Sequence, residues 1–123
     1  MTTPQPARPW PKEIRLRKAD RVLDVEFDDG HSFSIPAELL RVESPSAEVQ
    51  GHGAGRKKTV PGKRMVAIER VEPIGSYAVR LIFSDGHDSG LFTWDYLYEL
   101  GSDGDAKMSA YIAAIEEKGL SRD

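Results

Sequence analysis

Two short segments of this chain repeat each other 56 positions apart. Residues 27–31 read Phe-Asp-Asp-Gly-His and residues 83–87 read Phe-Ser-Asp-Gly-His, with Ile35 corresponding to Leu91. An Asp-Gly step favours a tight hairpin turn, because glycine adopts positive φ angles without strain. The repeat therefore predicts two related β-hairpins, and it constrains the fold more than any other feature of the sequence.

Apolar residues recur at every second position before each turn: Leu23, Val25 and Phe27, then Val79, Leu81 and Phe83. Such alternation buries one face of a strand and leaves the other in water, which is typical of antiparallel strands over a single core. Ile82 interrupts the alternation. This indicates that the strand before the second turn is central and covered on both sides.

Helix signals follow each hairpin. Pro36 opens a short helix, since the first helical position needs no backbone donor. Thr93 is the expected N-cap of a helix that ends at Gly101, and a last helix ends at Gly119. One-sided hairpins need helices over their apolar face, so we predict a two-layer α+β fold built from two related ββα units and a C-terminal helix.

We expect three parts along the chain. Residues 1–11 contain four prolines and form an extended arm, whose Trp10 staples itself to the core beside the first strand. Residues 12–101 form the main domain and include a long loop, 43–64, without periodicity; loops of that length are commonly functional or mobile. Residues 102–123 form a C-terminal helix and tail that pack on the domain.

The composition removes several classes of chemistry. The chain has no cysteine, which excludes disulfides, thiolate zinc sites, thiolate ligation of iron–sulfur clusters and cysteine nucleophiles. Its net charge of −3 gives no overall attraction for nucleic acid. No stretch has the pattern of a signal peptide or a membrane span, so we expect a cytoplasmic protein without membrane contact.

Residues 36–42 read Pro-Ala-Glu-Leu-Leu-Arg-Val, and residues 85–97 read Asp-Gly-His-Asp-Ser-Gly-Leu-Phe-Thr-Trp-Asp-Tyr-Leu. With the paired hairpins, these segments resemble the DUF971 family, also called the γ-butyrobetaine hydroxylase-like N-terminal domain. The similarity runs from about Trp10 to Leu100. It implies a domain that occurs alone in bacteria, precedes the oxygenase domain of carnitine-synthesis dioxygenases, and is attached to P-loop iron–sulfur carrier proteins in plastids.

The resemblance also implies where a metal lies in some relatives. In the dioxygenases, this domain carries a structural zinc on a Cys-x-Cys-x-x-Cys cluster and the histidine of the Asp-Gly-His turn. The matching positions here are Ser44, Ser46, Val49 and His87. Serine hydroxyls are poor zinc ligands and valine offers no donor, so we do not expect the zinc role to transfer.

We do not expect oxygenase activity to transfer either. A non-haem iron oxygenase needs two histidines and a carboxylate, usually with the carboxylate two positions after one histidine. His31, His52 and His87 all lack a carboxylate at that spacing. The barrel of such an enzyme would also need more chain than these 123 residues.

Three interpretations of His87 stay open. We favour a structural role, in which one ring nitrogen hydrogen-bonds a backbone carbonyl and closes the long loop. Alternatively, it is simply exposed to solvent. In the third, it forms a replacement site for zinc or iron together with His52 and one of three carboxylates. These carboxylates are Asp88, Glu43 and Glu48.

The remaining polar residues have simple interpretations. The aspartates near the turns are Asp28, Asp29, Asp85 and Asp88. Paired acids can do acid–base work, but turns favour aspartate in any protein, and we interpret them, with His31, as turn residues. The run Arg56, Lys57 and Lys58 is a candidate binding loop. It lacks interleaved aromatic residues for base stacking, so a solvated loop is favoured over a nucleic-acid site.

The sequence therefore predicts a non-enzymatic binding or adaptor module that needs no cofactor and whose partner is another protein. A sheet face or residues 44–64 would make the contact. The alternative is a metal-binding accessory protein, related to iron–sulfur or oxygenase systems, that uses histidine and carboxylate ligands. A small enzyme acting through His87 and its acidic neighbours is the least favoured hypothesis.

Overall fold

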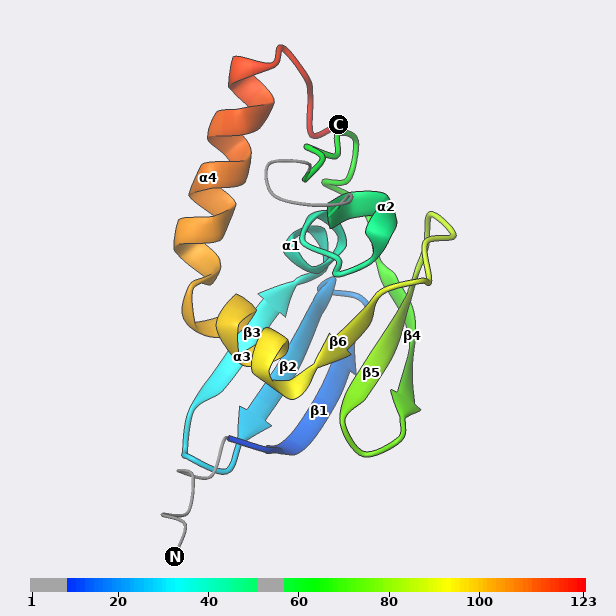
Figure 1. The fold of residues 1–123 in the computed structure, drawn as a ribbon, viewed down its shortest axis with the longest axis vertical. Helices are drawn as coiled ribbons and strands as arrows, with labels where there is room; N and C mark the ends of the chain where they lie inside the picture. Colours follow the sequence, from blue (N-terminus) through cyan, green and yellow to red (C-terminus); the bar gives the residue numbers. More distant parts are fainter. Residues whose placement is uncertain (1–8, 51–56) are drawn as a thin grey trace, which may run out of the picture.

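The computed structural model describes residues 9–50 and 57–123, which form two three-stranded antiparallel sheets beside each other (Figure 1). The first sheet has the order β1 (Pro11–Arg17), β2 (Val22–Phe27) and β3 (Ser32–Pro36). The second has the order β4 (Ile68–Ile74), β5 (Ala78–Phe83) and β6 (Leu91–Thr93). The central strand of each sheet is the one that precedes the repeated turn, and the α+β prediction is confirmed.

The helices in the described ranges are α1 (Ala37–Val42), α2 (Ala47–Gln50), α3 (Trp94–Ser102) and α4 (Gly104–Glu117). Thr93 caps α3 as predicted, because its hydroxyl accepts a hydrogen bond from the Tyr96 N–H at 3.3 Å. Two boundaries differ from expectation. α3 continues past Gly101, and α2 lies inside the predicted loop, since a helix of 4 residues is too short to show periodicity. None of these helices is long and apolar enough to cross a membrane.

The two hairpin turns have the same backbone geometry. Gly30 and Gly86 adopt φ angles of 91° and 90°, in the region that glycine tolerates. In the first turn the Phe27 N–H donates to the carbonyl of His31 at 2.8 Å, and in the second the Phe83 N–H donates to that of His87 at 3.0 Å. The repeat in the sequence is thus a repeat in structure.

The strands after the two turns are offset by one residue. Ile35 pairs with Leu23 in the first hairpin, and its counterpart opposite Val79 is Phe92. The expected match of Ile35 with Leu91 is therefore wrong: Phe92 is fully buried and Leu91 is 40% exposed. The second hairpin holds one extra residue between His87 and β6, which exchanges the faces expected for Leu91 and Phe92.

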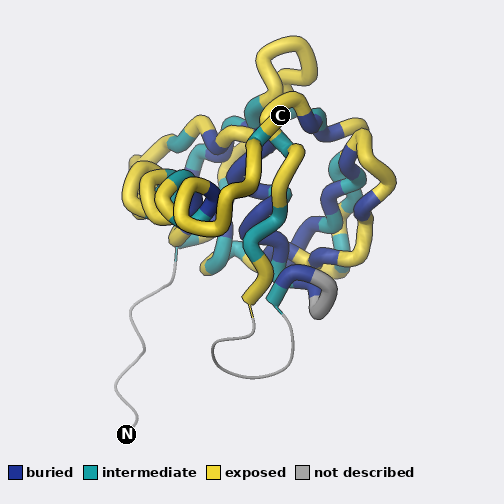
Figure 2. The backbone as a smooth tube through the Cα atoms, turned by 90° about the horizontal axis from the view of Figure 1, so that it is seen from above, coloured by how far each residue is buried: buried dark blue, intermediate teal, exposed yellow. Residues whose placement is uncertain are grey.

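One apolar core joins both halves of the chain. Its largest fully buried side chains include Phe27 and Phe83 beside the turns, Phe92 on β6 and Leu97 on α3. Figure 2 shows the buried residues gathered inside and the exposed ones at turns and outer helix faces. Burying one such side chain stabilises the fold by about 1.5–3 kcal/mol. Because the core mixes residues from the two ββα units, neither unit buries its apolar face alone.

The C-terminal segment closes over α1 and the chain near residue 62. α4 packs beside α1, where Val42 and Tyr111 belong to a small second apolar cluster (Figure 1). After a turn at Gly119, with φ of 65°, the chain runs back. There Arg122 donates two hydrogen bonds to Glu38, at 2.6 and 2.8 Å. The buried Glu38 carboxylate thereby gains a cation and two donors, which offsets its loss of hydration.

Trp10 lies outside the core rather than stapled into it. Its side chain is 50% exposed, and its ring lies against Trp94 with 6.2 Å between ring centroids. The backbone is fixed instead, since the Trp10 N–H donates to the Asp28 carboxylate and the Asp28 N–H donates to the Trp10 carbonyl.

We expect Gly101→Ala to destabilise the protein although alanine favours helices. A Cβ at Gly101 would lie 2.4–2.8 Å from side-chain atoms of Phe33, closer than van der Waals contact allows. The expected loss is about 1–3 kcal/mol in the free energy of unfolding, measured with urea. Gly104→Ala is the matched control. Its nearest atom would be Leu39 Cδ2 at 3.6 Å, so that variant should be neutral or more stable by up to about 1 kcal/mol. Equal stability of Gly101→Ala and wild type would contradict the packing described here.

Candidate functional site

Each hairpin turn is held by the helix that follows the other hairpin. In the first turn, Asp29 accepts a hydrogen bond from the Tyr98 hydroxyl of α3 at 2.7 Å. In the second turn, Asp85 accepts one from the Arg41 Nε of α1 at 2.8 Å. The partners are 69 and 44 residues apart. This reciprocal arrangement brings the chain after α1 against the second turn, where several candidate residues meet.

Asp85 is the charged centre of the second turn. Besides Arg41, it accepts hydrogen bonds from Lys63 Nζ at 2.6 Å and from the His87 N–H at 3.1 Å. Burial alone would raise the pKa of Asp85. The hydrogen bonds from Lys63, the His87 backbone and Arg41 outweigh burial and lower that pKa to about 2. Asp85 is therefore ionised at neutral pH and fixes the backbone that presents His87.

Ser44, Ser46 and His87 form a buried hydrogen-bonded group, which we call the Ser–His node. His87 Nε2 lies 2.9 Å from Ser44 Oγ and 3.3 Å from Ser46 Oγ, and the two hydroxyls are 3.4 Å apart. His87 is 7% exposed and Ser44 is fully buried. A hydroxyl both donates and accepts, so Nε2 of a neutral imidazole can be paired here whether or not it carries the proton.

The extra residue of the second hairpin belongs to the chain that packs against the Ser–His node. It lies in the segment that ends at Gly90, whose backbone faces Ser44: a Cβ on Gly90 would lie 2.3 Å from Ser44 Oγ and 3.2 Å from Pro45. Glycine is required at this position because the Ser44 hydroxyl occupies the space of a side chain.

A ring of polar contacts holds the chain that follows α1. Gln50 Nε2 donates to the Ser44 carbonyl at 2.9 Å, and the Tyr96 hydroxyl donates to the Glu43 carbonyl at 2.5 Å. Lys57 Nζ donates to the buried Glu43 carboxylate. Burial and the nearby Glu43 charge raise the pKa of Tyr96, so its hydroxyl stays protonated and remains a donor. These contacts thus fix the backbone that carries Ser44, in addition to the hydrogen bonds of its side chain.

The first turn carries a similar set of residues on the surface. His31 Nδ1 lies 3.0 Å from Asp29 Oδ2 and 3.1 Å from the Tyr98 hydroxyl, and the His31 ring stacks on Phe33. The hydrogen bond from Tyr98, followed by that from the His31 backbone, lowers the pKa of Asp29 to about 2. The His31 side chain is 63% exposed, against 7% exposure for the whole His87 residue. The same turn thus places one histidine in solvent and the other in a buried group.

The structure brings together three of the four positions matched to the zinc ligands of relatives, namely the members of the Ser–His node. Val49 is buried on α2, and its N–H donates to the Ser46 carbonyl at 3.1 Å. His87 meets the two hydroxyls through its Nε2 atom. Among residues 9–50 and 57–123, no three His, Asp or Glu side chains are grouped so that they could hold a metal ion.

The other candidates are dispersed. His52 and Arg56 lie outside the described residues, and nothing is described of the Glu48 side chain. Asp88 is exposed, Lys57 is paired with Glu43, and the Lys58 N–H donates to the Val49 carbonyl at 2.8 Å. The basic run therefore contributes one of its lysines to an ion pair within the protein.

Three residues that hold the two turns were not predicted from the sequence: Arg41, Lys63 and Tyr98. Arg41 lies in a segment that carried the family resemblance, and this was the one available signal. Lys63 and Tyr98 follow no local pattern that points to a distant aspartate. Their roles depend on the reciprocal contact of helices and turns, which is a property of the assembled fold.

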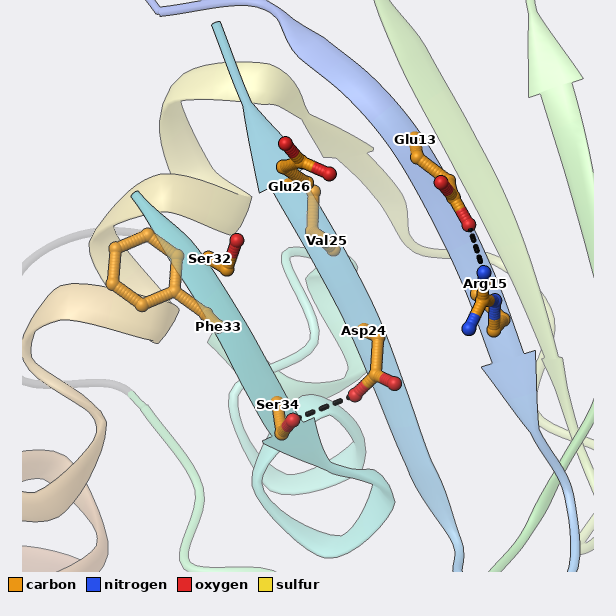
Figure 3. A pocket seen from close by; sticks show the side chains of 8 residues that line it. All are labelled: Glu13, Arg15, Asp24, Val25, Glu26, Ser32, Phe33 and Ser34. Atoms are coloured by element: carbon orange, nitrogen blue, oxygen red, sulfur yellow. Dashed lines mark hydrogen bonds and ion pairs between the residues drawn. The ribbon is translucent and has the colours of Figure 1, made fainter. Parts of the chain in front are cut away.

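A surface hollow of about 270 Å³ lies on the open face of the first sheet (Figure 3). Four of its polar side chains pair with one another: Ser34 donates to Asp24 at 2.6 Å, and Arg15 donates to Glu13 at 2.6 Å. No histidine lines it. The described hollows are lined by residues other than the three members of the Ser–His node.

Comparison with known proteins gives one family and several solved structures. The family model described as gamma-butyrobetaine hydroxylase-like, N-terminal, matches residues 14–98. One NMR solution structure shares 49% identity, covering 95% of this chain and 92% of that chain, with a TM-score of 0.83. A second NMR structure shares 42% identity over 99% and 91% of the two chains, with a TM-score of 0.82. The comparison with curated proteins finds no match.

A crystal structure is also similar. It is that of a DUF971-family protein of unknown function from Acidithiobacillus ferrooxidans ATCC 23270. The identity is 44%, over 74% of this chain and 91% of that chain, and the TM-score is 0.63. The sequence identities to these three structures, 49%, 42% and 44%, are high enough to show a common family and not only a common fold.

His87→Ala should destabilise the protein much more than His31→Ala. The first change leaves two buried hydroxyls without their imidazole partner, at an expected cost of about 1–3 kcal/mol in the free energy of unfolding. The second removes an exposed ring at the equivalent position of the other turn and should cost less than half as much. Urea denaturation of both variants measures the difference. Equal losses of stability in the two variants would show that the Ser–His node stabilises the fold no more than the exposed His31 ring does.

Proposed function

Because the chain belongs to the γ-butyrobetaine hydroxylase-like N-terminal family, DUF971, we propose that it is a non-catalytic module that acts by binding another protein. The observation that carries the proposal is the Ser–His node. At the positions matched to a metal cluster in relatives, this chain has hydroxyls bonded to His87 in a buried, self-satisfied group.

The accessibility of the node supports a non-catalytic role. Ser44 Oγ and His87 Nε2 are 2.9 Å apart, which is the separation of a nucleophile and its base in hydrolases. However, Ser44 is fully buried, and the described hollows lie elsewhere. A substrate would have to displace the chain around Gly90 or the chain after α1 to reach the hydroxyl. The pair is therefore suited to holding the two halves together rather than to acyl transfer.

The ligand atoms of the Ser–His node, two hydroxyls and one imidazole, argue against a bound zinc or iron ion in the proposed module. Serine hydroxyls stay protonated at neutral pH and compete poorly as ligands for these ions. The alternative function, a metal-binding accessory protein, needs His52 or another ligand to join His87. No observation on the described residues favours it, and metal analysis separates the two functions directly.

We expect the protein, purified without a histidine tag, to contain less than about 0.1 zinc or iron per chain. The variant Ser44→Cys/Ser46→Cys/Val49→Cys should instead bind about one zinc per chain, because three thiolates and His87 supply a tetrahedral set. Elemental analysis gives the metal content, and added zinc should raise the melting temperature of the variant alone. One metal per chain in the wild type would contradict the proposal and establish the accessory function.

Partner binding is tested by affinity capture from cells that naturally contain the protein. At low salt, the immobilised chain should enrich one protein in near-stoichiometric amount. That protein, once purified, should bind the chain in calorimetry with a 1:1 end point. An unrelated domain of similar size and net charge serves as the control bait. If no purified candidate binds, or if the chain turns over a substrate, the proposal fails.

A further inference from the structure

A small hollow lies between α4 and residues 57–59, which include two lysines of the candidate binding loop. We call it the basic hollow, and it encloses about 140 Å³. This volume is less than the roughly 300–1,000 Å³ of sites that take a whole small molecule, so the hollow suits a single side chain. Polar side chains of residues 57–59 line one wall, and small side chains of α4 line the other.

The polar wall of the basic hollow is held in place before any ligand arrives. The Lys58 N–H donates to the Val49 carbonyl at 2.8 Å, and the Tyr111 hydroxyl donates to the Val60 carbonyl at 2.5 Å. Between these two points, the Thr59 hydroxyl accepts a hydrogen bond from Lys118 Nζ at 2.8 Å. A site whose backbone is already fixed loses less entropy when a ligand binds.

The basic hollow offers hydrogen-bond donors and positive charge. Its one lining carboxylate, Glu43, is buried and already accepts a hydrogen bond from Lys57 Nζ. Lys58 is exposed, and its ammonium has no hydrogen-bond or ion-pair partner among the described residues. The Thr59 hydroxyl accepts from Lys118 and keeps its own proton to donate. Two lysines against one glutamate leave the lining with a net positive charge, to which Lys118 adds.

The shape of the basic hollow favours a carboxylate side chain over a nucleotide. Ala110 and Ala114 are one helical turn apart on α4, so their methyl groups form an apolar wall that the methylene groups of an acidic side chain can contact. Its carboxylate would then reach Lys58 and Thr59, and hydrogen bonds from a charged donor are the stronger kind. A nucleotide base would find no ring face for stacking, because the lining ring of Tyr111 is only 7% exposed.

We propose that the basic hollow receives the side chain of a glutamate or aspartate in the partner protein. This inference rests on the proposed protein-binding function and specifies the chemistry of the partner at one surface. The net charge of −3 does not oppose it, since salt screens charges beyond about 8 Å at physiological ionic strength and the hollow itself is positive. Single-stranded nucleic acid is the competing occupant that the experiment distinguishes.

The probe is the peptide acetyl-Gly-Glu-Gly-amide, compared with its glutamine counterpart, which has nearly the same shape without the charge. Titration into the ¹⁵N-labelled protein should shift the backbone amide signals of Lys58 and Thr59 in a saturable way. The glutamine peptide should bind about threefold more weakly, in keeping with an ion pair at a protein surface. A short oligothymidylate tests the competing occupant and should bind more weakly than the glutamate peptide.

Two variants with matched controls locate the binding. Lys58→Gln should weaken the glutamate peptide about threefold, whereas Lys18→Gln, the same change at an exposed lysine outside the hollow, should leave its affinity unchanged. Ala110→Leu should fill the hollow and weaken the peptide by a similar factor. Its control is Ala113→Leu, which adds the same side chain to an exposed position of α4 outside the hollow.

Four outcomes would each overturn the inference. They are equal binding of the glutamate and glutamine peptides, tighter binding of the oligothymidylate, no saturable shift of the Lys58 and Thr59 signals up to roughly 20 mM glutamate peptide, and equal effects of either variant and its control. Circular dichroism of each variant confirms that it is folded, so a loss of binding reports on the hollow.

The Lys58→Gln variant also separates this inference from the proposed function. If a captured partner binds wild type and Lys58→Gln equally well, the protein is a binding module that uses another surface, and the inference alone fails. If the glutamate peptide binds as expected but no purified partner does, the hollow has the stated chemistry and the proposed function fails. A partner whose affinity falls about threefold in Lys58→Gln, and also on replacing one of its own acidic residues, supports both.

Discussion

The fastening of each hairpin turn by the opposite helix is the interaction on which the rest of the structure depends. Tyr98 of α3 holds Asp29 in the first turn, and Arg41 of α1 holds Asp85 in the second. Neither ββα unit contains the partner of its own turn, and the core is likewise shared. We therefore expect the two ββα units to fold and unfold together, although each has the same local structure.

One extra residue makes the two related hairpins unequal. The two turns have the same backbone geometry, yet Ser44 and Ser46 lie against His87 and not against His31. The buried histidine, His87, makes hydrogen bonds within the protein. The exposed histidine, His31, packs against Phe33 and Tyr98. Because the Ser–His node is buried, other molecules can contact only the surface of the protein. Our functional proposal follows from that.

Local signals in the sequence were sufficient for the two turns, the strand alternation and the Thr93 cap, because each depends on neighbouring residues. They failed at Phe92, where a single inserted residue changes the face, and at the short α2. The meeting of Ser44 with His87 spans 43 positions and was suggested by family resemblance alone. Tyr98 and Lys63 gave no local sign, since their partners are set by tertiary packing.

The C-terminal segment has a consequence for the order of events during synthesis. Glu38 lies on α1, but the guanidinium that compensates its buried charge belongs to Arg122, 84 positions later. At about 5–20 residues per second, a ribosome needs several seconds to cover that distance. During this time the Glu38 carboxylate lacks the cation that offsets its burial, so packing α1 into its final place is less favourable than in the complete chain.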